Sequence, residues 1–245
     1  EQIKNAITQV FGIPSVNQFF KTRERQKGIQ QYQAYNSASD NFFTIKEGPL
    51  TFLVNLERYL DSGLFLDHRP LRKKLVNGLA KDKRVLNLFC YTGSLSVASA
   101  FGGATQVISI DMSGTYLDWA VENFKVNNLD YKQHRFLQED CLKSVEKLHE
   151  EKELFDLILL DPPSFSNSKR MEDVLDVQRD HVNMINNTMR SLAEGGTLIF
   201  SNNLRSFKLD ADALSAYTIK DISAQTIDED FKRNPKIHQC WLITH

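Results

Sequence analysis

The sequence predicts an α/β protein with a Rossmann-like, doubly wound and mostly parallel sheet, preceded by a small β-rich N-terminal region. From about Val85 onward, short apolar segments typical of buried strands alternate with amphipathic segments typical of helices. A turn with one glycine, Gly93, follows the first of these strands. Acidic residues end three later strands, and because parallel strands bind ligands at their carboxyl ends, this edge is the expected site. The three acids are Asp111, Asp140 and Asp161.

Strands and helices of the sheet region are expected to alternate along the chain. The strands are short apolar runs, and the helices are longer segments whose apolar residues recur at helical spacing. A glycine pair closes the last long helix, because glycine readily ends a helix. The expected strands are Arg84–Phe89, Gln106–Asp111, His134–Gln138, Phe155–Asp161 and Thr197–Ser201, and the expected helices are Leu95–Phe101, Thr115–Asn127, Cys141–His149 and Asp173–Ala193, with Gly195-Gly196 after the last.

The two ends of the chain follow other patterns. Residues 1–66 are expected to form a small α+β region, residues 67–82 a joining helix and residues 83–245 the sheet domain. The tail indicates a helix, a weak strand and a better strand, and an antiparallel final hairpin would fit. The N-terminal elements are a helix near Ile3–Phe11, strands at Gln30–Tyr35, Phe42–Lys46 and Leu50–Leu56 and the joining helix His68–Leu79; the tail elements are Ala211–Tyr217, Asp221–Ala224 and His238–Thr244.

Composition limits the class of protein. The 245 residues are 41% hydrophobic, enough for a large core, and the formal net charge of −1 indicates no general affinity for nucleic acid. Cys90, Cys141 and Cys240 have no CxxC spacing and are expected to be buried and unreactive. The six histidines lack ligand spacing, so we expect no metal; His68 and His181 are expected to be structural or exposed. Without a membrane-length apolar run or a signal peptide, we expect a cytoplasmic protein.

The segment Phe155–Phe165 is the most informative of the chain. A buried strand brings Asp161 to the edge of the sheet, where Pro162 and Pro163 end the ladder because proline donates no hydrogen bond. Phe165 follows, so a carboxylate, free carbonyl groups and an aromatic face come together. Such a set can hold a flat heterocycle, and Asp-Pro-Pro after a buried strand is typical of methyltransferases that act on nitrogen atoms in planar groups. Alternatively, Phe165 packs into the core.

The turn after the first strand suits S-adenosylmethionine (SAM) better than a dinucleotide. It has one glycine, Gly93, whereas a dinucleotide site needs several so that the main chain can approach a pyrophosphate, a group that SAM lacks. Asp111 follows at a distance that reaches a ribose, and Asp140 can accept the adenine amino group. Either acid alone would be a helix N-cap, but three acids at strand ends favour a ligand site.

Motifs along nearly the whole chain carry a family resemblance. They are Asn87–Gly93, Ile110–Ser113, Gln138–Cys141, Asp161–Met171, Asp176–His181, Ser201–Asn203, Phe231–Asn234 and Ile237–Ile243, with Val54–Tyr59 and Leu64–Arg69 in front. They resemble the Rossmann-fold, SAM-dependent rRNA methyltransferases, and in particular the C-terminal half of the bifunctional bacterial 23S rRNA enzymes that make N2-methylguanosine and N7-methylguanosine. The resemblance implies SAM as cofactor, guanine N7 of 23S rRNA as target, and a missing N-terminal half with THUMP-type RNA binding and N2 activity. The cofactor contacts that it implies are Asn87, Phe89, Tyr91, Thr92, Gly93, Asp111, Met112, Asp140, Cys141 and Asp161.

Methylation at guanine N7 needs positioning more than acid–base catalysis. N7 has an in-plane lone pair and no proton to remove, so N7, the methyl carbon and the sulfur must lie in line. Asp161, Asn202 or Asn203 can hold the N1–H and N2–H donors of the guanine. Cytosine-C5 methylation would need a cysteine after the strand that runs into Ser201, and none is there. The candidate catalytic residues are Asp161, Pro162, Phe165 and Asn202.

Charged residues outside the turns give weaker signals. Arg69, with Asp67 beside it, can pair the methionine carboxylate of SAM, in a segment that closes over the cofactor in related enzymes. A salt bridge between Asp67 and Arg72 is an equal alternative. Basic residues that either contact RNA or face solvent are Lys21, Arg23, Arg25, Lys27, Arg69, Arg72, Lys73, Lys74, Lys169, Arg170, Arg205 and Lys208.

Three alternatives stay open. Exocyclic N2 of guanine competes with N7, because Asp-Pro-Pro also suits an amino group. A non-catalytic RNA-binding or assembly module would keep the fold without methyl transfer, and a dinucleotide-dependent oxidoreductase would bind NAD at the Gly93 turn. The intact segment Asp161–Phe165 argues against the non-catalytic module, and the single glycine at Gly93 argues against the oxidoreductase.

Overall fold

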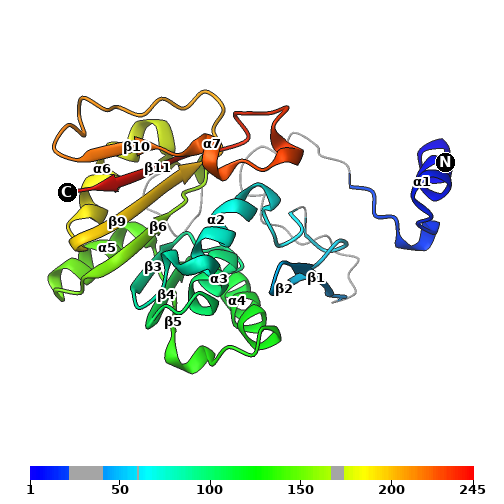
Figure 1. Cartoon of the computed structure of the whole chain (residues 1–245), viewed down its shortest axis with the longest axis horizontal. Coiled ribbons are helices and arrows are strands. Elements are labelled where there is room, and N and C mark those ends of the chain that lie inside the picture. Colours follow the sequence, from blue (N-terminus) through cyan, green and yellow to red (C-terminus); the bar gives the residue numbers. More distant parts are fainter. Residues whose placement is uncertain (22–40, 60, 167–173) are drawn as a thin grey trace.

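The computed structural model of the protein describes residues 1–21, 41–59, 61–166 and 174–245, and its centre is a seven-stranded sheet (Figure 1). The strand order is β10-β11-β9-β6-β3-β4-β5. Neighbours from β9 to β5 are parallel, whereas β11 is antiparallel to both β9 and β10. The strand order reverses between β3 and β6, the place where doubly wound sheets bind ligands. The strands are β3 (Arg84–Leu88), β4 (Gln106–Asp111), β5 (Arg135–Gln138), β6 (Phe155–Leu160), β9 (Leu192–Asn202), β10 (Thr218–Asp221) and β11 (Gln239–Thr244).

Helices cover both faces of this sheet, so each face has its own apolar core. On β3, Leu86 and Leu88 belong to the core beneath α5 and α6, while Val85 belongs to the core beneath α2, α3 and α4. Alternation of this kind follows from the two-residue period of a strand. Both faces are apolar, which explains the continuous hydrophobic runs of the sequence. The helices are α2 (Arg69–Lys74), α3 (Ser94–Phe101), α4 (Gly114–Val126), α5 (Cys141–Glu150), α6 (Val177–Met189) and α7 (Ser223–Thr226), with helical turns at Leu66–His68, Leu75–Leu79, Tyr131–Gln133 and Glu229–Phe231.

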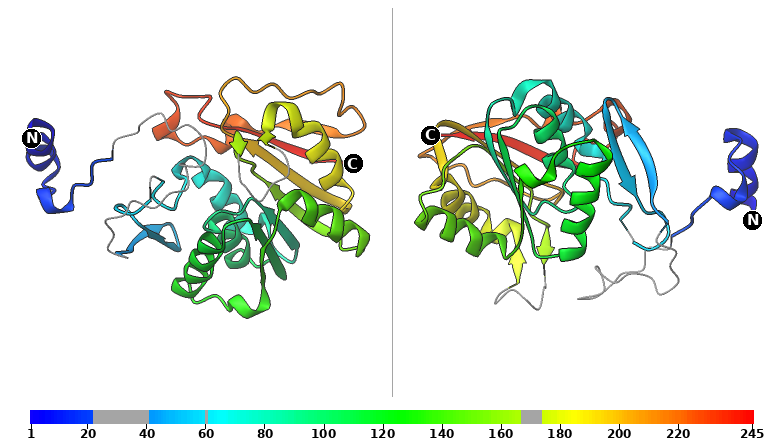
Figure 2. Two further views of the ribbon diagram at one scale, coloured as in Figure 1. Left: turned by 180° about the vertical axis from the view of Figure 1, so that it is seen from behind. Right: turned by 90° about the horizontal axis from the view of Figure 1, so that it is seen from below.

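A two-stranded hairpin of β1 (Phe43–Glu47) and β2 (Leu50–Val54) packs beside α4. The side chains of Asn123 and Asn127 accept hydrogen bonds from the main-chain N–H groups of β2, at 2.9 and 2.8 Å. By contrast, α1 (Gln2–Phe11) buries none of its residues and lies apart from the sheet in every view (Figures 1 and 2). The predicted helix and these two strands are confirmed. The strand expected at Gln30–Tyr35 lies outside the described residues, and the domain boundary at residue 66 stays a prediction.

The long helix expected over Asp173–Ala193 is wrong at both ends. Helix α6 begins at Val177, because Leu175–Asp176 form a short strand and Asp176 caps the helix, and it stops at Met189, so the glycine pair belongs to β9. The ladder between β6 and β9 shifts register there, because Phe155 pairs with Leu192 while Leu157 pairs with Thr197. Gly195 has φ 70°, a left-handed conformation that glycine adopts without strain. The glycines therefore accommodate a bulge in a strand and do not end a helix.

The tail expectations are partly wrong. No helix forms over residues 211–217; consecutive turns with i→i+3 hydrogen bonds bury Leu214 instead. The weak strand comes earlier than expected, as β10, because Asp221 Oδ1 accepts a hydrogen bond from the Ser223 N–H and turns the chain into α7. The antiparallel pairing of the last two strands is confirmed, although β11 lies inside the sheet, between β10 and β9.

A buried ion pair joins the hairpin to α2. The side chain of Arg72 has no exposed surface and donates two hydrogen bonds of 2.6 Å to the Glu47 carboxylate and one of 2.9 Å to the Phe65 carbonyl. The alternative salt bridge between Asp67 and Arg72 is therefore wrong, and Arg72 does not face RNA. A buried arginine without its carboxylate is strongly destabilising.

We expect Glu47→Ala to lower the free energy of unfolding by about 3–5 kcal/mol, because it leaves the Arg72 guanidinium buried and unpaired. Urea denaturation followed by circular dichroism measures the change. Glu122→Ala, which removes the exposed partner of Lys125 on α4, is the matched control and should hardly alter stability. Equal effects of the two substitutions would contradict this account of the pair.

Candidate active site

The turn after β3 has an unusual backbone conformation. Phe89, Tyr91 and Gly93 have φ of 57°, 51° and 73°, a region that side chains other than glycine rarely adopt. A Cβ atom at Gly93 would lie 2.6 Å from the Cβ of Ala120, so this position also requires glycine for space. Backbone strain of this kind persists where the surroundings hold it, and it is common at functional sites.

The carboxylate of Asp111 holds this turn. Its Oδ2 accepts a hydrogen bond from the Tyr91 N–H, and its Oδ1 accepts one from the Ser113 N–H, both at 2.9 Å. Burial raises the pKa of Asp111 above its usual range despite these donors. Asp111 is half-buried, and each of its oxygens has a second lone pair for a ligand hydroxyl. The helix N-cap that follows is Ser113, so the N-cap alternative for Asp111 is wrong. Its contact with a ribose stays a prediction.

Asp140 does cap a helix. Its side chain accepts a hydrogen bond of 2.9 Å from the Leu142 N–H at the start of α5, as the alternative interpretation stated. Asp140 remains half-buried at the end of β5, and Met112 lies on the neighbouring turn, where its carbonyl accepts a hydrogen bond from the Gln138 side chain. A cofactor contact of either residue stays a prediction.

The side chains of three predicted cofactor residues are buried within the protein. Asn87 donates a hydrogen bond of 2.8 Å to Ser96, Thr92 donates one of 2.6 Å to the Gly63 carbonyl, and Cys141 accepts one of 3.2 Å from the Phe89 N–H. These side chains support the turn from inside the protein, so a cofactor bound on its outer side would contact only their main-chain atoms. The three cysteines are free and buried as expected, and burial raises the pKa of each thiol.

The segment before α2 lies over the turn. Besides the bond from Thr92, the hydroxyl of Tyr91 donates to the Asp61 carbonyl at 3.5 Å. The Phe65 ring lies 5.2 Å from the Tyr91 ring, which in turn lies 4.5 Å from Tyr116. A cluster of three aromatic rings therefore borders the turn and Asp111. Apolar rings next to carboxylate acceptors fit an adenosine group, which offers a flat face and hydroxyl donors.

The Asp-Pro-Pro turn is accessible at the end of β6. Asp161 Oδ1 accepts a hydrogen bond of 2.7 Å from the Ser201 hydroxyl, and 28% of the Asp161 side chain is exposed. Pro162 is buried. Phe165 is 52% exposed on the short strand β7 (Phe165–Ser166), which pairs with β8 (Leu175–Asp176). The alternative that Phe165 packs into the core is therefore wrong.

Asn202 is the predicted site residue, but the structure buries Asn202 and exposes its neighbour Asn203. The Asn202 side chain is buried, and its Oδ1 accepts a hydrogen bond from the Leu204 N–H, so it cannot line the site in this structure. Asn203 is exposed and accepts a hydrogen bond of 2.7 Å from Ser164 on the Asp-Pro-Pro turn. Successive residues at a strand end point in opposite directions, and sequence alone does not show which of two adjacent asparagines points outward.

Arg69 and Asp67 already have partners within the chain. Arg69 donates hydrogen bonds to Asp228 at 3.0 Å and to Asp230 at 3.2 Å, and Asp67 accepts one of 2.9 Å from His238. Both residues remain predicted cofactor contacts, but Arg69 would have to exchange these carboxylates for that of SAM.

Sequence reasoning missed the approach of His68 to Asp161 and the packing of His238 against His68. His68 Nε2 lies 3.6 Å from Asp161 Oδ2, and His238 packs against the His68 ring with 4.9 Å between centroids. One donor atom each from Asp67, His68 and His238 lies within 4.8 Å of the others. Hydrogen bonds account for the Asp67–His238 contact, and the absence of a metal stays a prediction. The two histidines are 170 positions apart, so no local spacing could signal them.

Several of the predicted basic residues face solvent. Lys73, Lys74 and Lys208 are exposed, and Arg205 is exposed and donates to the Asn234 side chain. The basic residues from Arg23 to Lys27 and those at positions 169 and 170 lie outside the described residues. The structural role of His181 is confirmed, since it is buried and accepts a hydrogen bond from the Asp210 N–H.

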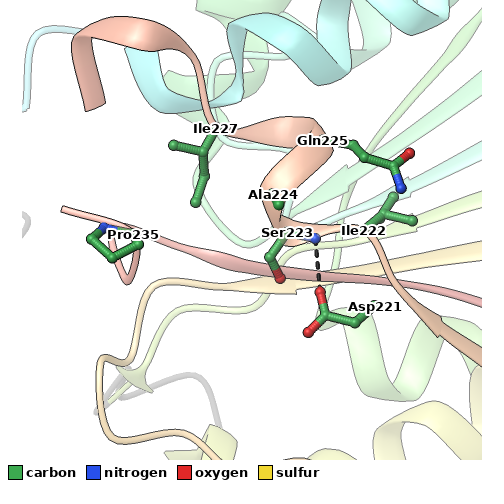
Figure 3. A pocket seen from close by; sticks show the side chains of 7 residues that line it. All are labelled: Asp221, Ile222, Ser223, Ala224, Gln225, Ile227 and Pro235. Atoms are coloured by element: carbon green, nitrogen blue, oxygen red, sulfur yellow. Dashed lines mark hydrogen bonds between the residues drawn. The ribbon is translucent and has the colours of Figure 1, made fainter. Parts of the chain in front are cut away.

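Two hollows of the described residues lie apart from the Gly93 turn and Asp161. One of about 340 Å³ is bordered by α7, with Asp221, Ile227 and Pro235 among its walls (Figure 3). A second of about 580 Å³ lies between α2 and the sheet, next to Lys73, Lys74 and Lys220. Neither includes the Gly93 turn or Asp161, so we place the site at the open edge where the acids and aromatic rings meet.

Comparison with known proteins shows the family and the cofactor of the chain. Residues 20–239 match the family described as S-adenosylmethionine-dependent methyltransferase. The chain belongs to this family, and its cofactor is SAM. The turn fits that cofactor, since it combines a half-exposed carboxylate with aromatic rings and needs no phosphate-binding loop. The oxidoreductase alternative therefore loses its support.

Individual relatives agree with the family. The chain is 59% identical to "Ribosomal RNA large subunit methyltransferase K/L" of Cellvibrio japonicus, over 99% of this chain and 32% of that protein. It is 50% identical to "Ribosomal RNA large subunit methyltransferase K" of Neisseria meningitidis serogroup B, over 100% of this chain and 68% of that protein. The chain thus spans about a third of the length of the K/L relatives. Among solved structures, SMU.776 complexed with SAH has a TM-score of 0.72 and 27% identity, over 85% of this chain and 57% of that one.

These comparisons confirm the predicted fold, a Rossmann-like methyltransferase fold with a mostly parallel seven-stranded sheet and additional antiparallel strands near the N-terminus. In the parts of the chain that the structure describes, no helix is long and apolar enough to span a membrane.

We expect Asp111→Ala to weaken SAM binding at least tenfold, because charge-assisted hydrogen bonds are worth about 1.5–3 kcal/mol each and about 1.4 kcal/mol corresponds to a factor of ten. Isothermal calorimetry of the folded variant measures the affinity. Asp118→Ala, on the exposed side of α4, is the matched control and should bind as the wild type does. Unchanged affinity in a folded Asp111→Ala protein would remove Asp111 from the cofactor site.

We expect saturating S-adenosylhomocysteine to raise the melting temperature, because a ligand that binds only the folded state stabilises it by mass action. NAD at the same concentration should not, since the turn has one glycine and no pyrophosphate site. Differential scanning fluorimetry compares the two. A similar shift with NAD would return the oxidoreductase interpretation.

Proposed function

We propose that this chain transfers the methyl group of SAM to N7 of a guanine in 23S rRNA, in the cytoplasm. The observation that carries the proposal is the Asp161–Phe165 turn, in which a half-exposed carboxylate and an exposed aromatic ring lie at the same edge of the sheet as Asp111. The printed names of the K/L and K relatives, large-subunit rRNA methyltransferases, support the choice of RNA.

The chain's own residues suit positioning rather than proton transfer. SAM would supply the methyl group from its sulfonium. Asp111 and the Gly93 turn would hold the nucleoside end of the cofactor, with Phe65 and Tyr91 beside its flat face. Because guanine N7 has no proton to lose, the remaining task is to place the base in line. No residue of this site has to act as a general base.

The target base would lie against the Asp-Pro-Pro turn. Phe165 offers a ring on which an extruded guanine can stack. The Asp161 carboxylate accepts hydrogen bonds, and the guanine edge offers N1–H and N2–H donors. Asn203, whose amide is fixed by Ser164, lies on the adjoining strand end and replaces Asn202 in this role. Positive charge that develops on the methylated base is favourable next to a carboxylate and an aromatic face.

Exocyclic N2 of guanine is the second candidate target. Asp161 is an acceptor without a competing cation among its described partners, which are a hydroxyl and an imidazole. Such an acceptor can position the exocyclic N2 amino group for methylation as well as it can hold the N1–H and N2–H donors while N7 is methylated. The K/L name of the relatives does not separate the two targets. We also propose that a further N-terminal half, with THUMP-type RNA binding and N2 activity, accompanies this chain, because the K/L relatives are about three times as long.

We expect incubation of undermethylated 23S rRNA with the protein and SAM to yield N7-methylguanosine. Nucleoside digestion and mass spectrometry locate the methyl group. N2-methylguanosine as the product would replace the N7 proposal with the N2 alternative. If the longer relatives' extra segment is needed for RNA binding, full-length protein should act where this chain does not, and transfer by neither would favour a non-catalytic module.

We expect Phe165→Ala to lower the rate of methyl transfer to RNA about 5- to 150-fold, because base stacking on an aromatic ring is worth about 1–3 kcal/mol. The affinity for SAM and the melting temperature should stay nearly constant, since the ring is largely exposed. Phe101→Ala is the matched control, because Phe101 is also exposed but ends α3, away from the edge where that helix begins. A rate equal to that of the control would show that the base platform lies elsewhere.

A further inference from the structure

His68 is a buried side chain whose hydrogen-bonding capacity is not met. It is 6% exposed, its Nδ1 is buried without a partner, and its Nε2 lies 3.6 Å from Asp161 Oδ2 and 3.9 Å from Asp67 Oδ2. Both distances are longer than a hydrogen bond. Unsatisfied buried groups are uncommon in folded proteins, and each needs an explanation.

The surroundings of His68 favour one tautomer of its ring. Carboxylate oxygens accept hydrogen bonds, so a proton on Nε2, the nitrogen that faces Asp161 and Asp67, is favoured over a proton on Nδ1, and we expect the neutral Nε2–H tautomer. Burial lowers the pKa of His68, while the Asp161 and Asp67 carboxylates oppose that effect and His238 and Arg72 add to it. Three parts of the chain bring these groups to His68. Asp161 follows β6, Asp67 and Arg72 belong to the segment around α2, and His238 comes just before β11.

A chain of contacts holds the ring in place. Asp67 Oδ2 accepts a hydrogen bond of 2.9 Å from His238 Nδ1, and His238 Nε2 lies 2.9 Å from the Thr226 hydroxyl on α7. Burial would raise the pKa of Asp67, but this bond and the two nearby imidazoles keep it below its usual range, so Asp67 is ionised. The His238 ring lies 33° from the plane of the His68 ring. Rotation of His68 is therefore limited on one side by His238, the residue before β11.

We propose that His68 is a positioning residue for Asp161. The electrostatic attraction between the His68 Nε2–H and Asp161 Oδ2, 3.6 Å apart, directs the carboxylate toward the target base, while Ser201 holds its other oxygen. The Asp67–His238–Thr226 chain keeps His68 in that orientation, so that the C-terminal strand β11 acts on the Asp-Pro-Pro turn. The role in catalysis rests on the proposed methyl transfer, whereas the contact between His68 and Asp161 does not.

The first test uses the rate of methyl transfer to 23S rRNA. We expect His68→Leu, which removes the donor, to lower kcat about 10- to 100-fold, because small displacements of a positioning group have effects of this size. His68→Gln, whose amide N–H can replace Nε2–H, should restore the rate to within about threefold of wild type. The SAM affinity of both should stay within about twofold. His181→Leu removes another buried histidine, away from Asp161, and should lose stability while its rate per folded molecule is unchanged. Equal losses for Leu and Gln at position 68 would overturn the proposal.

The second test needs no activity, so it separates this inference from the proposed function. The ring nitrogens of His68 are assigned by NMR on the intact chain, with His68→Gln to identify the signals. We expect the Nε2–H tautomer at neutral pH, and Asp161→Asn should lower the pKa of His68, because it removes a carboxylate that favours the charged ring. A Nδ1–H tautomer, or titration that Asp161→Asn leaves unchanged, would overturn the inference. Wild-type protein that shows this coupling but methylates no RNA would refute the proposed function alone.

Discussion

The parallel register of four central strands is the constraint on which the site depends. Leu88, Ile110, Leu160 and Phe200 lie in one row across β4, β3, β6 and β9. The residues that follow them along the chain are Phe89, Asp111, Asp161 and Ser201. The hydrogen-bonded ladders thus place the strained turn, two carboxylates and a hydroxyl at one edge. A slip of one residue in β6 would turn Asp161 to the other face of the sheet.

The two carboxylates at this edge are hydrogen-bonded within the protein. Asp111 is bonded to the N–H groups on both of its flanking turns, and Asp161 is bonded to Ser201 on the next strand. Such arrangements fix the acceptors before a ligand arrives, which lowers the cost of ordering them on binding. Tight internal bonding also explains why the buried Asn87 and Thr92 belong to the motif without lining the site.

The segment around α2 links the edge to the periphery of the fold. The buried Arg72–Glu47 pair anchors it to the N-terminal hairpin, and Asp67 and His68 anchor it to β11 and β6. Arg69, between them, is paired with two carboxylates near the C-terminus. The segment therefore has separate contacts with the hairpin, with the end of β6 and with the start of β11.

The sequence alone determined the sheet, its helices and the position of the acidic edge. Apolar periodicity identifies buried strands directly, and proline, glycine and acidic residues at strand ends have local physical reasons to be there. For the same reason the sequence predicted that Asp111, Asp161 and the Gly93 turn lie at the carboxyl edge of the sheet. Local patterns predicted the structure least well at two places. The glycines at 195 and 196 accommodate a bulge in a strand and do not end a helix, and residues 211–217 form turns instead of a helix.

Only the tertiary structure decided which polar side chains reach the edge. It buried Asn202 and exposed Asn203, paired Arg72 with Glu47, and brought His238 beside His68 across 170 positions of sequence. Each of these outcomes depends on contacts between segments far apart in the chain. Burial and pairing are properties of the packed whole, so no window of sequence contains them.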